Sequence, residues 1–580
     1  MVQSATTSTF NRVIEAKPHT SVYTMHKYFA RRPWNVFREL IAHYTSPGDI
    51  VLDPFCGGGV TVVEALKLGR KVIGIDVNPL ATYVTSMEVR PIDLDALEQA
   101  FGQVRRRVSQ RILSMYRTTC SNCRAEAYAD WTEWDESARK MLRIKYQCPA
   151  CSYSGEKAPS EQDLKLTRQI DRDFESIVEQ DHLSFPKTAI PVGDKTSSLL
   201  SQNVNHFYEL FTKRNLLALS ILSKEIDFIG RESEFLRFAF SSSLKWASRQ
   251  SHLRGEIVEG WALHAYWIYP RSLEINLWNT FERRWQAVAR GKRYSNRNIA
   301  SCIFTNRFAD LDSGRASCMI MTRNAASVPI PDQSVDTIIT DPPYGGNVNY
   351  GELSDYWMIW HKDGNLIDKR DEVIINRTQA KKIGDYEKLL YAIFKECYRV
   401  LKTDRCLVST FNSRDLKIVA SFVLAASRAG FMLHPDGLLY QSPIRAYTTT
   451  FHAMQIGAFV GDFIFTFTKE KRAPPEIPPA QDELERLDRY VESLVNEEVQ
   501  SEVAEPQVRE KAYRALIPFL AKYSAVDIDA CRAAVNFFEG QMRRQHDHFK
   551  TVRVKITSQR KQAFLSRRRK SSSAKATGRT

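Results

Sequence analysis

Four residues, Asp341-Pro342-Pro343-Tyr344, follow a run at 334–340 that reads as a buried strand, and they carry groups suited to chemistry on an amine. An amino group on an aromatic ring is a poor nucleophile because its lone pair is delocalised into the ring. The Asp341 carboxylate can accept one N–H and the Pro342 carbonyl the other, which frees that lone pair. The two prolines stiffen the turn, and Tyr344 can stack on the ring. The run predicts group transfer to a ring-bound amine, with a simple strand-ending turn as the alternative.

A second candidate site lies near the start of the chain, where residues 53–59 read Asp-Pro-Phe-Cys-Gly-Gly-Gly. Glycines let the backbone approach a ligand closely, and the helix that follows offers its N-terminal N–H groups. An acid opens this turn and no GxGxxG is present, which suits an amino group of the ligand rather than a pyrophosphate. Asp76 ends the next expected strand, at a position that accepts hydrogen bonds from ribose hydroxyls. A plain tight turn and a solvated Asp76 are the alternative.

Four of the ten cysteines form two close pairs with the spacing C-x2-C-x24-C-x2-C: Cys120, Cys123, Cys148 and Cys151. Each pair can form a turn that presents two thiolates, and two such turns complete a closed tetrahedral zinc site. The spacing predicts a structural zinc ion, with four reduced surface thiols as the alternative. Tryptophans and basic residues alternate between the pairs, a pattern that suits nucleic-acid contact and equally suits the core and rim of a small ribbon.

The elements that must position these groups alternate between strand and helix in two separate parts of the chain. Residues 50–52 and 71–76 read as strands, with helical spacing over 61–68 between them. The alternation resumes after residue 315 and ends near 469. Its elements there are strands at 334–340, 406–411 and 462–467 and helices at 386–401 and 416–428. We infer one doubly wound α/β domain interrupted by an insertion rich in helical, charged stretches.

The end of the chain differs in composition from the rest. Residues 471–480 contain four prolines and read as a linker, and the stretches 481–496 and 509–544 are amphipathic and helical in pattern. Residues 558–580 carry eight Lys and Arg and no acid, which predicts a disordered basic tail.

Length, charge and cysteine content limit the kinds of protein that this chain can be. At 580 residues the chain is too long for one core, since single cores stop growing at roughly 250–300 residues. The balance of 82 Lys and Arg against 67 Asp and Glu gives a net charge of +15, which favours a polyanionic partner. No apolar run is long enough to span a bilayer, and residues 1–12 lack the apolar core of a signal peptide. Two close cysteine pairs suit a reducing compartment, so we expect a cytoplasmic protein without membrane association.

The cofactor-like strings resemble a known family. Residues 48–59, followed by Gly-Ile-Asp-Val-Asn-Pro at 74–79, resemble the cofactor motifs of DNA amino-methyltransferases, which modify adenine N6 or cytosine N4. The usual family string is Asp-Pro-Phe-x-Gly-Ser-Gly-Thr, from which this chain departs at Gly58 and Val60. Residues 26–34 resemble the motif that precedes the cofactor loop and contacts the methionine end, with a helix at 34–44 beside the sheet.

The catalytic string extends the resemblance. Residues 341–355 look like a branch of bacterial DNA methylases that carries a large mid-domain insertion, and so do residues 211–215 and 274–278. The resemblance covers roughly residues 19–469. It implies an α/β fold with a Rossmann-like sheet of seven strands, interrupted by a mostly helical insertion that bears a zinc ribbon, and a helical C-terminal region.

The resemblance also implies a division of the chain and a set of site residues. The divisions are the cofactor-binding half (19–90), the insertion that recognises the target (91–314, zinc ribbon 117–155), the catalytic half (315–469), a linker and helical region (470–557) and the tail (558–580). S-adenosylmethionine would be held by Tyr28, Asp53, Pro54, Phe55, Gly57, Gly59, Asp76, Asn78 and Asn324, the last as a contact to the adenine ring. The catalytic residues would be Asp341, Pro342, Pro343 and Tyr344, and the four paired cysteines would hold structural zinc.

The expected function is S-adenosylmethionine-dependent, site-specific methylation of adenine N6 on a base flipped out of DNA, in a restriction or phage-defence system with its own partner proteins. Ser-Pro-Pro is commoner among cytosine-N4 enzymes, which favours adenine and leaves cytosine N4 as an alternative. Some RNA guanine-N2 methyltransferases share Asp-Pro-Pro-Tyr, but no RNA-binding module is recognisable in the sequence. A non-catalytic, zinc-bearing DNA-binding protein is the remaining alternative.

Overall fold

The computed structural model describes residues 8–361, 364–441, 461–470, 481–501, 505–524 and 526–543. The linker expected at 471–480 and the basic tail expected at 558–580 lie outside these residues, as do residues 544–557. Among the helices that are described, none combines the length and the apolar character needed to cross a membrane.

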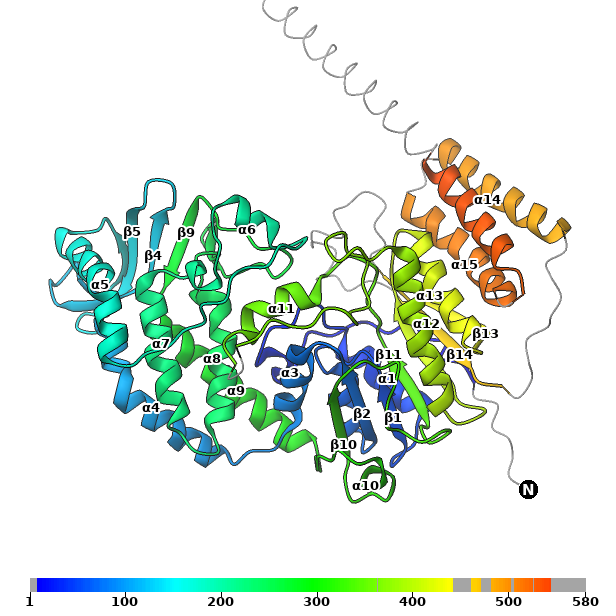
Figure 1. The fold of residues 1–580 in the computed structure, drawn as a ribbon, viewed down its shortest axis with the longest axis horizontal. Helices are drawn as coiled ribbons and strands as arrows, with labels where there is room; N and C mark the ends of the chain where they lie inside the picture. The colour runs from blue at the N-terminus through cyan, green and yellow to red at the C-terminus, as the bar shows by residue number, and fades with distance from the viewer. Residues whose placement is uncertain are drawn as a thin grey trace, which may run out of the picture.

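A sheet of seven strands forms the centre of the molecule (Figure 1), as the family resemblance predicts. Its order is β10-β2-β1-β11-β12-β14-β13, and β14 runs in the direction opposite to the other six strands. The strands are β1 (Ile50–Asp53), β2 (Lys71–Asp76), β10 (Cys318–Thr322), β11 (Thr337–Thr340), β12 (Cys406–Phe411), β13 (Met432–Gln441) and β14 (Asp462–Thr468).

The strand order creates a crevice at one place in the sheet. The chain proceeds from β1 to β2 and β10 in one direction and from β11 to β12 in the other, so the direction reverses between β1 and β11. Ligands of open α/β sheets bind outside the carboxyl ends of the strands at such a switch point. Asp53 ends β1 and Asp341 follows β11, so this topology brings the two predicted halves of the site together.

Helices cover both faces of the sheet. Alternate strand residues face opposite ways, so Val51 and Val72 join a core with the helices of one face, whereas Leu52 and Ile73 join the core of the other. The first face carries α1 (Trp34–Tyr44), α2 (Val60–Lys67) and α3 (Pro79–Val89). The second carries α12 (Ile383–Val400) and α13 (Leu416–Arg428), against which the C-terminal helices pack.

The C-terminal region is helical, as predicted, but its second stretch is not continuous. Helices α14 (Gln481–Ser501) and α15 (Glu505–Tyr523) are followed by a further helix at 528–543. The Asp527 side chain accepts a hydrogen bond from the Ala530 amide at 2.8 Å and so caps the helix at 528–543. The helical stretch expected at 509–544 thus contains the end of α15 and a second helix.

Most of the segment between β2 and β10 lies beside the sheet, to the left in Figure 1. After α3, its helices are α4 (Leu94–Ser114), α5 (Glu161–Gln180), α6 (Ser197–Ser201), α7 (Lys213–Asp227), α8 (Ser233–Ala247), α9 (Leu277–Asn298) and α10 (Phe308–Asp312). Its strands are β3 (Arg117–Thr119), β4 (Glu126–Asp135), β5 (Lys140–Gln147), β6 (Ser154–Lys157), β7 (His252–Arg254), β8 (Ile257–Glu259) and β9 (Arg271–Ile275). Strands β3 to β6 follow one another in a sheet, and the distant β9 pairs with β4 on the same sheet.

Candidate functional site

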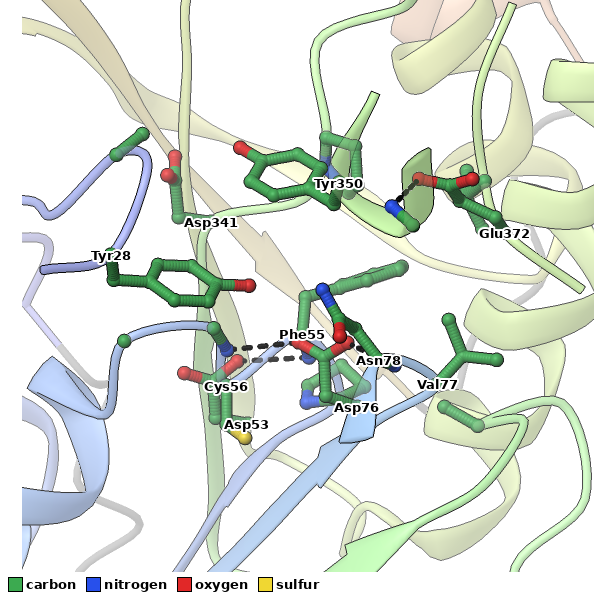
Figure 2. A pocket seen from close by; sticks show the side chains of 18 of the residues that line it. Tyr28, Asp53, Phe55, Cys56, Asp76, Val77, Asn78, Asp341, Tyr350 and Glu372 are labelled. Carbon is green, nitrogen blue, oxygen red and sulfur yellow. Dashed lines mark hydrogen bonds between the residues drawn. The ribbon is translucent and has the colours of Figure 1, made fainter. Parts of the chain in front are cut away.

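The carboxyl ends of the central strands surround one pocket (Figure 2), with about 980 Å³ of empty space that is partly open to solvent. Ten of the thirteen residues predicted to bind cofactor or act in catalysis line it: Tyr28, Asp53, Pro54, Phe55, Gly57, Asp76, Asn78, Asn324, Asp341 and Pro343. The other three, Gly59, Pro342 and Tyr344, do not line it. The structure thus brings the two sequence motifs to a single cavity at the carboxyl ends of the strands.

The end of β2 and the glycine turn are joined through one carboxylate. Asp76 accepts hydrogen bonds from the Gly57 amide at Oδ2 and from the Asn78 amide at Oδ1, each at 2.9 Å. Each oxygen keeps a further lone pair for a ligand hydroxyl. Asp53, which is 3% exposed, accepts at Oδ1 from the Phe55 amide at 3.1 Å. Both acids are thereby fixed in direction by backbone groups.

The turn needs glycine because the chain passes very close to its neighbours. Gly57 and Gly59 have φ values of +46° and +80°, which side chains rarely allow. A Cβ on Gly58 would stand 2.7 Å from Arg31 Nε, and one on Gly59 would stand 2.9 Å from Thr85 Oγ1. Gly59 therefore serves close packing of α2 on α3, whereas Gly57 and Gly58 leave bare backbone facing the pocket.

The pocket is acidic in a way that suits a cationic ligand. Burial raises the pKa of Asp53 to about 6 and that of Asp76 to about 7, and hydrogen bonds from Thr340 and from backbone amides oppose the shift only in part. Buried carboxylates without a counter-charge are costly in their ionised form. The ammonium and sulfonium groups of S-adenosylmethionine supply such a charge, so the residues present fit that cofactor.

We expect the affinity for S-adenosylmethionine to rise with pH between about 5 and 7, because a cationic ligand favours the ionised forms of Asp53 and Asp76. Each carboxyl group that must lose a proton changes the affinity by up to about tenfold per pH unit below its pKa. Titration calorimetry at several pH values, in two buffers of different ionisation enthalpy, measures both the affinity and the protons released. The variant Asp76→Asn should flatten the profile; a pH-independent affinity without proton release would contradict the expectation.

The same raised pKa values act on folding without ligand. The folded protein holds these two protons more tightly than the unfolded chain does, so the free energy of unfolding that they contribute falls as pH rises from about 4 to about 7. Above that range the cost of ionising these two carboxylates in the pocket is fully present.

Asp341 is held by three donors. Its Oδ1 accepts from the hydroxyls of Tyr344 and Thr410, the latter at 2.6 Å, and its Oδ2 accepts from Arg32 Nε at 2.6 Å. A carboxylate offers about four acceptor positions, so one position on Oδ2 is left for an N–H of a substrate. In Figure 2 Asp341 lies across the pocket from Asp53 and Asp76, where a second substrate would face the cofactor.

Arg32 is a site residue that the sequence did not predict. Its Nη1 also donates to both oxygens of Asp462, at 3.0 and 3.1 Å, so the guanidinium joins two carboxylates from different strands. Burial alone would lower its pKa, but Asp341 and Asp462 raise it well above its ordinary value. Arg32 lies within the motif at 26–34, yet its partner Asp341 is 309 residues away, and no local spacing signals that contact.

The remaining residues of the catalytic string are firmly placed. The Tyr344 ring packs against Phe411 at a centroid distance of 4.7 Å and lies under the Arg32 guanidinium, and its hydroxyl donates to Asp341. The Pro343 carbonyl accepts from the Tyr386 hydroxyl at 2.6 Å, and Pro342 is buried. The stacking role of Tyr344 and the acceptor role of the Pro342 carbonyl stay predictions.

Two tyrosines and an acidic loop complete the pocket. The rings of Tyr28 and Tyr350 lie 6.1 Å apart at 19°, and both line the cavity (Figure 2). Glu372, from the loop that precedes α12, accepts from the Gly351 amide at 2.8 Å and so fixes the start of α11 (Tyr350–Met358). Asn324 uses its side-chain oxygen to accept from the Ala326 amide at 2.9 Å, which holds the rim of the pocket beside β10. Its contact to an adenine ring stays a prediction.

The four paired cysteines meet at one point of the insertion. One pair lies in the turn between β3 and β4 and the other between β5 and β6, and their ligand atoms all lie within 4.8 Å of one another. The sulfurs of Cys120 and Cys151 are 3.8 Å apart, and those of Cys123 and Cys148 are 3.6 Å apart. Four sulfurs at about 2.3 Å from a tetrahedral zinc ion would lie about 3.8 Å from one another. The cluster therefore fits zinc, and its S–S distances are too long for disulfides.

Comparison with known proteins identifies the family of this chain. A family model described as DNA methylase matches residues 5–86 and 335–550, together just over half of the chain. The chain belongs to the DNA methylase family. The match covers both halves of the pocket and is interrupted over 87–334, where the structure has α4 to α10. The family comprises the adenine-N6 and cytosine-N4 methyltransferases, as the sequence resemblance predicts.

Curated relatives of this DNA methylase match over short stretches. The type II methyltransferase M.MjaII of Methanocaldococcus jannaschii is 26% identical over 90 residues, 16% of this chain and 17% of the relative. M.BsoBI of Geobacillus stearothermophilus is 30% identical over 104 residues, 17% and 20% of the two chains. The DNA adenine methyltransferase YhdJ of Escherichia coli K12 is 39% identical over 64 residues, 11% and 21% of the two chains. The matched stretches span about a fifth of the length of these relatives.

Proposed function

We propose that this protein transfers a methyl group from S-adenosylmethionine to an exocyclic amino group of a DNA base, with adenine N6 as the favoured target. The observation that carries the proposal is the pocket in which Asp341 faces Asp53 and Asp76 from the opposite side. Membership of the DNA methylase family and the excess of basic residues support DNA as the substrate.

The residues of the pocket account for the chemistry as follows. When bound, the cofactor supplies a methyl group on a positively charged sulfur. Asp76 accepts hydrogen bonds from ribose hydroxyls, and Asp53 together with the turn at 57–59 receives the methionine part. Asp341 accepts an N–H of the target amine through the free position on Oδ2, and the Pro342 carbonyl accepts the other. The amine lone pair would then face the methyl group. As the nitrogen gains the methyl carbon it would give up one N–H proton to solvent, and the electron pair of the broken S–C bond would stay on the sulfur. Catalysis therefore depends on positioning and electrostatics.

Arg32 and Thr410 orient the Asp341 carboxylate through their hydrogen bonds of 2.6 Å. Because the three donors to Asp341 leave one acceptor position, the carboxylate has a single direction in which it can bind an amine. The name of one relative, a DNA adenine methyltransferase, favours adenine over cytosine. The type II names of the others favour a restriction–modification setting. The proposed zinc ion would be structural, since all four of its ligands come from the protein.

The identity of the methylated nucleoside tests this proposal. The purified full-length protein is incubated with unmethylated, PCR-amplified genomic DNA and isotope-labelled S-adenosylmethionine, and the DNA is digested to nucleosides for mass spectrometry. We expect labelled N6-methyldeoxyadenosine. Labelled N4-methyldeoxycytidine would move the target to cytosine and leave the mechanism intact. A parallel incubation with cellular RNA tests the other substrate. Label in RNA guanine alone, or no label in either nucleic acid, would refute the proposed function.

A further inference from the structure

A second pocket lies in the insertion, with about 730 Å³ of empty space that is partly open to solvent. Its lining includes two tryptophans, one acid and two arginines: Trp131, Trp246, Asp130, Arg283 and Arg284. These residues come from β4, α8 and α9, and neither the catalytic string nor the four-cysteine cluster includes any of them. The combination of flat aromatic walls and cations differs from that of the acidic cofactor pocket.

The tryptophans are held in place by packing and by cations. Trp131 is 8% exposed and packs with Leu273 and Ile275 in a small cluster that Trp246 joins. The Arg143 guanidinium lies 5.5 Å from the centre of the Trp131 ring, and the Lys245 ammonium lies 4.6 Å from that of Trp246. Fixed aromatic faces beside cations are suited to nucleic-acid bases, because each base offers a flat face next to a phosphate.

Cations gather at and beside this pocket, where Glu259 attracts Lys245 and Asp130 attracts Arg283. Lys27, Lys245 and Arg284 form no ion pair within 4.0 Å in the described part of the chain. Burial and neighbouring cations, Lys27 for Lys245 and Arg290 for Arg284, together lower the pKa of Lys245 to about 8 and that of Arg284 to about 10. Glu259 opposes the shift of Lys245 only in part. Cations that repel one another are relieved by a polyanion, so the surroundings favour a phosphate-bearing ligand.

The one acid of the lining restricts how such a ligand can enter. The Asp130 carboxylate accepts a hydrogen bond from the side-chain amide of Asn279 at 3.1 Å, and its other lone pairs can accept further hydrogen bonds. A carboxylate repels phosphate but accepts the amino or imino N–H of a base. The base would therefore lie toward Asp130 and the tryptophans, and the phosphate toward the arginines.

A short chain segment connects the second pocket with the cofactor pocket. Arg284 Nη2 donates to the carbonyls of Thr24 and Met25, at 2.5 and 2.8 Å. Tyr28, which lines the cofactor pocket, follows only three residues later, a span of at most about 11 Å. A few nucleotides of one strand can bridge such a distance.

We propose that the insertion pocket binds one unstacked nucleotide of the DNA strand close to the target base. Its base stacks against Trp131 and Trp246, and its phosphates contact Arg283, Arg284 and Lys245. The proposal rests on the proposed function, because it takes DNA as the substrate.

The test measures binding of a fluorescein-labelled DNA single strand of mixed sequence to the full-length protein by fluorescence anisotropy. We expect Trp246→Ala to weaken binding about 5- to 100-fold, the contribution of one stacked base, and Trp246→Phe to retain most of the affinity. Arg283→Ala should reduce the dependence of log affinity on log salt by about 0.7. Arg297→Ala is the matched control, because Arg297 is exposed on the same helix but does not line the pocket.

Wild-type affinity in Trp246→Ala, or equal losses in Arg283→Ala and Arg297→Ala, would overturn the proposal. Tighter binding of an RNA strand with the same pattern among the variants would overturn its commitment to DNA. A methylation assay on the same variants distinguishes failure of the pocket proposal from failure of the proposed function. If the wild type does not methylate DNA but strand binding depends on Trp246, the pocket stands and the function fails. If Trp246→Ala methylates DNA with an unchanged KM for DNA, the pocket fails and the function stands.

Discussion

Replacing Asp341 with alanine should lower the rate of methyl transfer by about a hundredfold to a thousandfold and leave the affinity for S-adenosylmethionine nearly unchanged. The substitution removes the acceptor for one N–H of the target amine, and the loss of one hydrogen-bonding group aimed at the reacting centre has effects of this size. The cofactor residues Asp53 and Asp76 keep their backbone hydrogen bonds, which do not involve Asp341. Single-turnover methylation and calorimetric cofactor binding measure the two quantities separately.

Asp462→Ala provides the matched control for this prediction. Asp462 binds the same guanidinium of Arg32 as Asp341 does, but it does not line the pocket. Its loss frees one end of Arg32 without removing an acceptor for the substrate, so we expect a much smaller decrease in rate. Equal decreases in the two variants would show that the charge balance of Arg32, rather than contact with the amine, explains the effect of Asp341. An unimpaired Asp341→Ala variant would remove Asp341 from catalysis altogether.

The second large effect concerns the four-cysteine cluster. We expect the purified protein to hold about one equivalent of zinc and the double variant Cys120→Ser, Cys123→Ser to hold none. Structural zinc sites bind with apparent free energies of about 10–16 kcal/mol in small peptides, so its loss should markedly lower the melting temperature. Elemental analysis and thermal unfolding with and without a chelator check both expectations.

Cys302→Ser is the control for the zinc variants, because Cys302 is also a free, partly buried thiol but lies outside the cluster. It should leave the zinc content unchanged. A wild-type protein that is stably folded and free of metal would refute the zinc assignment, and so would a double variant that retains a full equivalent of the metal.

Much of the sheet could be predicted from the sequence, because its central strands are short apolar runs that end at chemically distinctive residues. The helix at 416–428 and the strand at 406–411 have the predicted bounds. The two strands that were not predicted, β10 and β13, lie at the two edges of the sheet. Strand β13 contains Pro435 and Gly437 and an irregular register between Leu433 and Leu438. Such residues usually interrupt a strand and are tolerated at an edge, where one side of the ladder is unpaired.

Contacts between distant segments explain what the sequence could not reveal. The strings at 211–215 and 274–278 share a resemblance to one branch of methylases, but nothing in either indicates that they touch. In the structure Thr212 and Arg214 both donate to the buried carboxylate of Glu274, and Asn215 donates to the carbonyl of Ile275 at 3.2 Å. These two segments therefore stabilise each other through hydrogen bonds within the insertion. The contact of Arg32 with Asp341 is hidden from the sequence for the same reason.

The pairing of β4 with β9 has a consequence for exchanging parts between related enzymes. Strand β4 emerges from the first cysteine turn, and its far half, from Trp131 to Asp135, forms a ladder with residues 271–275, more than 130 residues later. A chimera that transplanted only the segment 117–157 would leave that half of β4 paired with β5 alone and would remove Leu273 and Ile275 from their contacts with Trp131. The cysteine segment therefore cannot be exchanged by itself. A folded chimera would also need residues 271–275 of β9 from the same enzyme.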